Sequence, residues 1–325
     1  MTAIPHFAAQ RRFAHGYALS LAALCALLFL IGFPAAGYGQ PADTREVFVA
    51  GSGNDALDQY VIRLIEERVR ETLVLRPLSD WHSPSSHNVP VIAIGPAAVT
   101  RAQNLDPPPP VLALLVKKSS VEDYPGRPGS QLSAVYQEVP LIRQALTGKA
   151  ILPQATRIAL LASTESSDLY QPLLGQLEAF GLEARIFVAD TNDQLIPALN
   201  RALSYGDFLL AGPDDAIYNP RNIKHILLTA YRRNKILIGP NQIYVKAGAL
   251  ASSYPPMDTM ADQASRHLEQ FLATGHFPPS DYPIEYRVEV NEQVARSLNI
   301  PLPDPEQIAS TINRMLEENA GEMSE

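Results

Sequence analysis

The sequence has almost no cysteine: Cys25 is the only one among 325 residues, and it lies in an apolar run near the amino terminus. After residue 39 the chain has no thiol, which excludes a disulfide framework and a zinc site built on cysteine. Leu24 stands before Cys25, where a lipoprotein signal needs a small residue, so we expect no lipid anchor there. The folded part must therefore be held together by its hydrophobic core.

Patterns typical of catalysis and metal binding are also scarce. No Gly-x-Ser-x-Gly turn occurs, so the nucleophile elbow of a hydrolase is missing from the sequence. The histidines are scattered, and the pair Asp214-Asp215 offers too few converging oxygens for a hard cation. We therefore expect a protein that is not an enzyme and that uses no metal or cofactor.

The amino-terminal stretch has the pattern of a secretory signal peptide. Arg11 and Arg12 precede an apolar run over about residues 18–33, and Gly37 and Gly39 are small residues at the positions that a signal peptidase reads. We predict that residues 1–39 are cleaved and that the mature chain begins near Gln40. An uncleaved membrane anchor is the alternative, because the apolar run falls only slightly short of the roughly 18 residues that span a bilayer.

The mature chain is acidic. Without Arg11 and Arg12 it has 24 basic and 34 acidic residues, a net charge of −10. This balance argues against nucleic acid and against an anionic membrane surface as partners. A hydrophobic content of 46% is typical of a soluble globular protein, and a chain of this length can form two domain cores.

The stretch 153–181 predicts a β-loop-α unit. Residues 158–162 are almost wholly apolar, as in a parallel strand buried on both faces, and the polar loop 163–167 follows at once. Asp168 and Gly181 are predicted to cap the next helix at its two ends. Parallel sheets bind ligands in the loops beyond the carboxyl ends of their strands, so this loop is a candidate binding segment.

The same unit recurs along the chain, which predicts parallel sheets with right-handed crossovers in two lobes. Residues 132–136 and 249–254 read as crossings between the lobes, and the alternating segment 284–290 reads as a half-exposed strand at an edge or crossing. The predicted organisation is a signal peptide (1–39), a first α/β lobe (40–135 plus about 252–280), a second α/β lobe (136–251 plus about 281–318) and an acidic tail (319–325).

Several short segments of residues 131–314 resemble a known family. They are Leu152-Pro153-Gln154-Ala155-Thr156-Arg157-Ile158-Ala159-Leu160-Leu161, the loop 212–215, Gly248-Ala249-Leu250-Ala251-Ser252-Ser253-Tyr254, and Val288-Glu289-Val290-Asn291 with Ala295, Leu298, Asn299, Ile300 and Pro301. Together they resemble the ABC transporter substrate-binding proteins whose better-known members carry tryptophan and related aromatic amino acids. The first lobe departs from that family, because Lys117-Lys118-Ser119 replaces the usual Asp-Pro pair. We do not carry the aromatic specificity over.

The resemblance implies a type I periplasmic binding protein-like fold: α/β, with two doubly wound parallel-sheet lobes and a ligand cleft between them. It implies a monomeric periplasmic protein that closes on a small molecule, such as an amino acid or related carboxylate, and presents it to an ABC permease in the inner membrane. The alternative is an exported ligand-sensing module of the same fold that signals to a membrane receptor or kinase. A third reading, an exported enzyme, is disfavoured because the sequence assembles no catalytic constellation. The loose Gly-x-Gly-x-x-Ala match at residues 51–56 is a weak dinucleotide motif, and the export signal disfavours a soluble nicotinamide cofactor.

The loops at strand ends supply the candidate ligand contacts. Lys117 and the backbone amides at the helix start near Ala97 suit a carboxylate, and Asp214 suits an amine. Each candidate also has an ordinary role open to it as a cap, turn or surface group. The full set is Ser52, Asn54, Ala97, Ala98, Lys117, Ser163, Thr164, Ser166, Asp214, Asn241 and Tyr254.

Overall fold

The computed structural model describes residues 45–69, 73–82, 88–122, 124 and 130–322. The predicted signal peptide with Cys25 and the last three residues of the predicted acidic tail lie outside them. Within these ranges no helix is both long and apolar enough to span a membrane.

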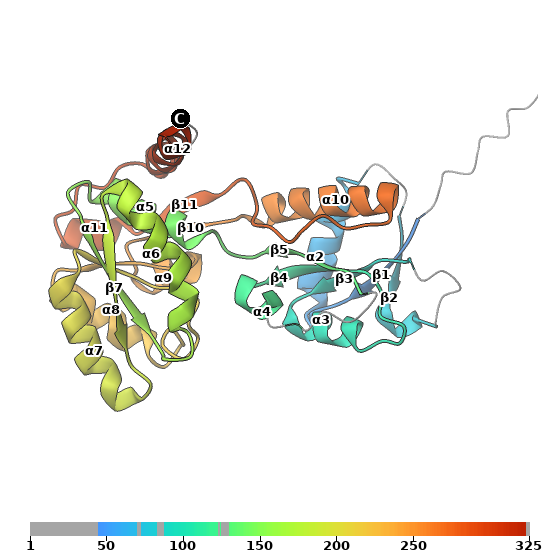
Figure 1. Ribbon diagram of the computed structural model, residues 1–325, viewed down its shortest axis with the longest axis horizontal. Coiled ribbons are helices and arrows are strands. Elements are labelled where there is room, and N and C mark those ends of the chain that lie inside the picture. Colours follow the sequence, from blue (N-terminus) through green and yellow to red (C-terminus); the bar gives the residue numbers. More distant parts are fainter. Residues whose placement is uncertain (1–44, 70–72, 83–87, 123, 125–129, 323–325) are drawn as a thin grey trace, which may run out of the picture. The chain divides into compact units, whose positions relative to one another are not determined.

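The first sheet is wholly parallel and has the order β2-β1-β3-β4-β5. Its central strands are buried on both faces, as their unbroken apolar runs predict. The strands are β1 (Arg45–Ala50), β2 (Leu73–Pro77), β3 (Val91–Ile94), β4 (Val111–Val116) and β5 (Leu132–Tyr136). Helices α2 (Asp55–Glu66), α3 (Pro96–Gln103), α4 (Lys118–Glu122) and the turn η1 (Leu78–Asp80) belong to the same part of the chain. The later helix α10 (Met257–Thr274) packs against α2, β4 and β5, as Figure 1 shows.

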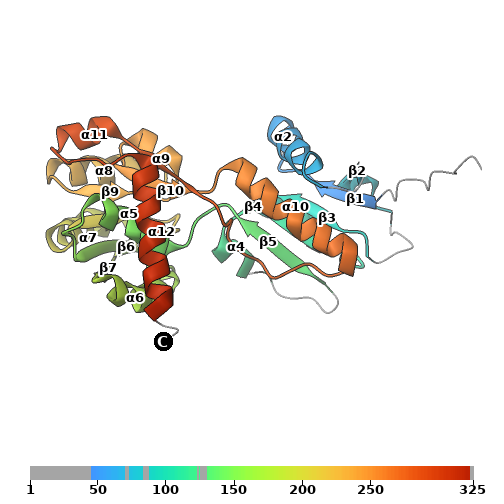
Figure 2. The ribbon, with the colours of Figure 1, turned by 90° about the horizontal axis from the view of Figure 1, so that it is seen from above.

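The second sheet has the order β11-β10-β9-β8-β6-β7 and is parallel except for β11. Its strands are β6 (Arg157–Ala162), β7 (Glu183–Val188), β8 (Phe208–Leu210), β9 (Ile236–Ile238), β10 (Ala251–Tyr254) and β11 (Arg287–Val290). Its helices are α5 (Leu141–Ile151), α6 (Gln171–Leu177), α7 (Asn192–Tyr205), α8 (Ile223–Arg232), α9 (Gln242–Ala247), α11 (Glu292–Ser297) and α12 (Pro305–Glu322). Helix α12 packs against α5 and β11 (Figure 2). The α/β fold with two sheets confirms the predicted fold class.

The β6-loop-α6 unit forms as the sequence predicts, with one difference at the start of the helix. Residues 158–162 are fully buried, and Gly181 ends the helical segment in the left-handed conformation at φ 64°. Asp168 does not cap α6, because the turn η2 (Ser167–Tyr170) comes first and α6 begins after it. The Tyr170 side chain is fully buried and donates a hydrogen bond to the Leu161 carbonyl, which fixes this extra turn against the strand.

Three segments differ from their predicted roles. Residues 132–136, expected as a crossing between the lobes, form β5 inside the first sheet, where they pair with β4. Residues 251–254, expected to return toward the first lobe, form β10 inside the second sheet, where Ala251 pairs with Ile238 and β11 pairs antiparallel along the other side. Residues 319–322, expected in a frayed tail, continue helix α12. The alternating segment that predicted an edge strand is β11, and the structure confirms that it is the outermost strand.

Three segments connect the two sheets: residues 137–140 after β5, residues 255–256 after β10, and residues 275–286 after α10. The third lies beside the end of β5, since the Tyr136 N–H donates to the Asp281 carbonyl at 3.1 Å and the Asp281 N–H donates to the Ala134 carbonyl at 3.0 Å. These crossing segments place the carboxyl ends of strands from both sheets beside one another.

His267 is a buried ionisable group in the core under α10. Its side chain is 4% exposed, with Nδ1 3.0 Å from Ser133 Oγ and Nε2 3.2 Å from Gln263 Nε2. A neutral ring that donates from Nδ1 and accepts at Nε2 satisfies both partners. Burial lowers the pKa of His267, Arg266 lowers it further, and Asp281 opposes the shift.

We expect the free energy of unfolding to decrease as pH falls below about 6.5, the ordinary histidine pKa, because the unfolded chain then binds a proton that the buried ring resists. Urea unfolding of the wild type and of His267→Gln between about pH 5 and pH 8 checks this. The variant should have the flatter profile. His225→Gln, which changes an exposed histidine on α8, is the matched control and should leave the slope unchanged. Equal slopes for wild type and His267→Gln would contradict the assignment.

Candidate ligand-binding site

Two cavities lie beside the crossing segments, at the carboxyl ends of strands from both sheets. The large cavity holds about 660 Å³ and the small cavity about 300 Å³. Four residues line both cavities: Glu138, Gly212, Pro213 and Pro240. Each of these follows the end of a strand, namely β5, β8 or β9. The two cavities are therefore adjoining parts of one cleft between the lobes.

The large cavity is lined by ion pairs and aromatic side chains. Lys117, directly after β4, contacts Asp215 at 2.6 Å, and Arg287 contacts Asp258 at 3.3 Å. The first of these pairs joins the two lobes, because Lys117 and Asp215 follow strands of different sheets. The apolar lining comes mainly from Tyr60, Ile243, Tyr244, Tyr254, Met257 and Met260.

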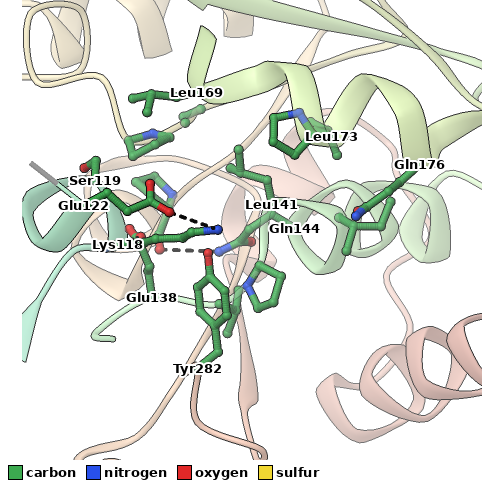
Figure 3. Close-up of a pocket in the computed structure, with 18 of the residues that line it drawn as sticks. Lys118, Ser119, Glu122, Glu138, Leu141, Gln144, Leu169, Leu173, Gln176 and Tyr282 are labelled. Carbon is green, nitrogen blue, oxygen red and sulfur yellow. Dashed lines mark hydrogen bonds and ion pairs between the residues drawn. The ribbon is translucent and has the colours of Figure 1, made fainter. Parts of the chain in front are cut away.

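The small cavity has an apolar wall and a polar floor (Figure 3). Leu169 and Leu173 come from η2 and α6, and Leu141 comes from the first turn of α5. Opposite them Tyr282 points its hydroxyl toward the middle of the cavity. Burial raises the pKa of Tyr282, so its hydroxyl stays protonated.

Glu138 is the carboxylate at the junction of the two cavities. One of its oxygens accepts a hydrogen bond from the Lys118 backbone N–H at 3.0 Å. Burial raises the pKa of Glu138, although this hydrogen bond and the nearby charges of Lys117 and Lys118 act in the opposite direction. Ionisation of Glu138 in the folded protein therefore costs free energy.

Glu138→Gln is expected to stabilise the ligand-free protein at neutral pH, because it removes the buried charge and keeps an oxygen for the Lys118 N–H. Because the pKa is raised, the penalty is absent well below the ordinary value of 4.5, grows as pH rises from 4.5 to the folded-state value, and stays constant above that value. Thermal unfolding of both proteins across this pH range measures the effect. A Gln variant that is less stable than wild type at neutral pH would contradict it.

Three of the predicted ligand contacts line the large cavity: Lys117, Asn241 and Tyr254. The Asn241 side chain also caps α9 by accepting a hydrogen bond from the Ile243 N–H at 3.0 Å. Tyr254 ends β10 and is half-buried, and burial raises its pKa. These three come from the ends of β4, β9 and β10, as the strand-end argument requires.

The predicted contacts in the loops after β6 and β8 hold those loops together. Asp214 is 1% exposed, and its carboxylate accepts hydrogen bonds from the N–H groups of Ser163, Ala216 and Ile217. The Ser163 hydroxyl accepts from the Ser166 N–H, and Thr164 binds Asp190 through its N–H and its hydroxyl. None of these predicted contacts lines either cavity in the described residues, and their role toward a ligand stays a prediction.

The predicted contacts after β1 and β3 likewise have partners within their own loops. The Ser52 N–H donates to the Asp58 carboxylate, and the Asn54 side chain caps α2 by accepting from the Leu57 N–H. Ala97 is exposed at the start of α3, whereas Ala98 is buried and its N–H donates to the Gly95 carbonyl. Ligand binding by these four residues stays a prediction as well.

Sequence reasoning missed three residues of the cleft: Glu138, Gln144 and Tyr282. Glu138 follows the predicted extended segment 132–136 by two residues, so the strand-end argument that selected Lys117 applies to it equally. Gln144 interrupts the apolar face of the predicted helix at 139–146, which is a signal for a buried polar contact. Tyr282 lies in an irregular segment, and no sequence pattern marks it.

Comparisons with known proteins identify the fold. No protein-family model and no curated protein matches the chain. A ligand-free, open substrate-binding protein with adhesive properties from Clostridium difficile matches with a TM-score of 0.61 at 15% identity, over 81% of this chain and 97% of that one. An ABC domain in complex with L-Trp from Streptococcus pneumonia matches with a TM-score of 0.53 at 16% identity, over 82% and 98%. A conserved domain protein from Vibrio cholerae matches with a TM-score of 0.53 at 15% identity, over 83% and 98%.

These matches cover almost the whole length of each solved chain, so both lobes take part in the likeness. At such identities the likeness shows a shared fold. The chain therefore has the two-lobed, type I periplasmic binding protein-like fold of substrate-binding proteins.

Proposed function

We propose that this protein binds a small molecule in the cleft between its lobes, closes on it without chemical change, and presents it to an ABC permease after export to the periplasm. The observation that carries the proposal is the position of the cleft: both cavities adjoin strand ends of both sheets and share Glu138, Gly212, Pro213 and Pro240. Clefts at this position bind ligands throughout open α/β folds.

Closure follows from the way the two lobes contribute to the cleft. Lys117 and Glu138 come from the first lobe and the crossing, whereas Asp215 and Asn241 come from the second lobe. A ligand that contacts both groups at once has more contacts in a closed arrangement, so its binding shifts the population toward closure. The three crossing segments are the natural hinge, since they contain the chain's passages between the two sheets.

The structural neighbours support this proposal by analogy. One is a substrate-binding protein, and another is an ABC domain that holds L-Trp. The predicted contacts Lys117, Asn241 and Tyr254 are our proposed ligand contacts in the large cavity, and Glu138 and Tyr282 are those in the small cavity.

Thermal unfolding against a library of amino acids, amines, small carboxylates and nucleosides tests the proposal. The protein is expressed from its full sequence, purified, unfolded and refolded, so that no bound compound from the host remains. A ligand present at 100 times its dissociation constant adds about 2.7 kcal/mol of stability, which gives a clear rise in melting temperature. We expect at least one chemical class to give this rise. A refolded protein that responds to no compound would contradict uptake of these classes and favour the sensory alternative.

A further inference from the structure

The charges of the cleft are not balanced. Its three cations are each paired with a carboxylate: Lys117 with Asp215 at 2.6 Å, Lys118 with Glu122 at 3.5 Å, and Arg287 with Asp258 at 3.3 Å. Two lining carboxylates remain, Glu138 and Asp168, and no salt bridge of the described residues includes either.

Both remaining carboxylates line the small cavity, and Glu138 is the less exposed of the two. Asp168 is exposed at the rim, whereas Glu138 is half-buried and has one backbone hydrogen bond, from Lys118. The field of Lys117 and Lys118 reaches Glu138, yet burial still raises its pKa. A half-buried carboxylate in this situation is stabilised by a cation that enters the cavity.

The rest of the small cavity fits the body of an organic cation. Leu141, Leu169, Pro172 and Leu173 form an apolar wall, and a volume of about 300 Å³ leaves room for a compact hydrocarbon group. The Tyr282 hydroxyl lies on the opposite side (Figure 3), near enough to Glu138 for that carboxylate to raise its pKa, and its oxygen can accept a hydrogen bond from an ammonium group. Of the carboxylate-binding groups expected from the sequence, Lys117 is paired with Asp215 and the Ala98 N–H donates to the Gly95 carbonyl.

We propose that the ligand carries an ammonium group on a compact apolar body, and that Glu138 holds this ammonium in the small cavity beside the Tyr282 hydroxyl while the leucine wall packs against the body. The inference rests on the proposed function. It makes Glu138 the residue that selects ligands by charge, and it requires no carboxylate on the ligand.

Three probes with one phenyl body and different head groups test this charge selection: phenethylamine, 2-phenylethanol and 3-phenylpropionate. Calorimetric titration into the refolded protein should detect binding of phenethylamine and none of the other two. Glu138→Gln should weaken phenethylamine binding about 30-fold or more, because it removes one partner of a buried charge pair. The matched control is Glu178→Gln, which removes the same charge from an exposed site on the turn η3 (Glu178–Phe180), outside both cavities. It should change the dissociation constant less than about twofold.

Binding of the alcohol or the carboxylate as tight as that of the amine would overturn the inference. An unchanged amine affinity in Glu138→Gln would overturn it too, and so would the absence of binding by all three probes. The wider ligand library tests the proposed function separately. If only anionic or neutral compounds raise the melting temperature, the proposed binding function is supported and the ammonium site is contradicted.

Discussion

Asp214→Ala should lower the free energy of unfolding by about 3 to 5 kcal/mol, because it leaves the buried N–H groups of Ser163 and Ile217 without this acceptor and also removes the bond from the Ala216 N–H. The carboxylate of Asp214 accepts from Ser163, Ala216 and Ile217 and is 1% exposed. It therefore joins the loop after β6 to the loop after β8, directly beneath the part of the cleft formed by Gly212 and Pro213. A loss of this size is a large part of the 5 to 15 kcal/mol that stabilises a typical domain.

The neighbouring residue supplies a matched control. Asp215→Asn removes the same charge one position later, where the side chain is 81% exposed and pairs with Lys117. An exposed ion pair contributes about 0 to 1 kcal/mol, so this variant should unfold almost like the wild type. Urea unfolding of both variants measures the difference, and the slope with urea should stay constant. Equal stabilities of Asp214→Ala and Asp215→Asn would contradict the structural role of Asp214.

Gln144→Ala should lower the free energy of unfolding by about 2 to 4 kcal/mol. The reason is that the Gln144 amide makes hydrogen bonds to β10 that a neighbouring strand would otherwise make. Strand β9 ends at Ile238, opposite Ala251, so the later residues of β10 have no partner on that side. Gln144 fills the gap: its Oε1 accepts from the Ser253 N–H at 2.9 Å and its Nε2 donates to the Ser253 carbonyl. Without it, the Ser253 N–H loses its acceptor and the Ser253 carbonyl keeps only the Ser252 hydroxyl, at 3.2 Å.

Gln176→Ala is the control for this substitution, since Gln176 lines the small cavity, as Gln144 does, but from the exposed side of α6 (Figure 3). We expect a change within about 0.5 kcal/mol for this surface position. Hydrogen exchange adds a local readout, because the Ser253 amide should exchange faster in Gln144→Ala and at the wild-type rate in Gln176→Ala. A Ser253 amide that exchanges equally in all three proteins would contradict the contact.

The positions of most strands could be predicted from the sequence because the signals of a strand are local. Residues 158–162 form an unbroken apolar run and are fully buried, and the alternation at 284–290 marks the outer strand β11. The run 249–254 misled the prediction, since the two serines in it suggest a solvated connection. In the folded chain both serines are buried, and Gln144, more than a hundred residues earlier, supplies their hydrogen bonds.

The residues of the cleft were harder to predict from the sequence, because the role of a strand-end residue depends on the direction in which its side chain points. Asp214 and Asp215 are adjacent and chemically alike, yet one is buried under the loop and the other reaches Lys117 in the other lobe. Glu138 has no salt-bridge partner because each cation of the cleft is paired with another carboxylate, and this pairing depends on contacts between distant segments. Local sequence patterns contain neither kind of information.

Hydrogen exchange of the refolded protein, with and without the first library compound that stabilises it, tests the central claim most directly. Binding in the cleft predicts slower exchange in both lobes at once: in residues 117–118 and 137–140 on one side and in residues 211–215 and 240–244 on the other. Protection confined to one lobe, or located away from these four segments, would contradict a ligand site between the lobes.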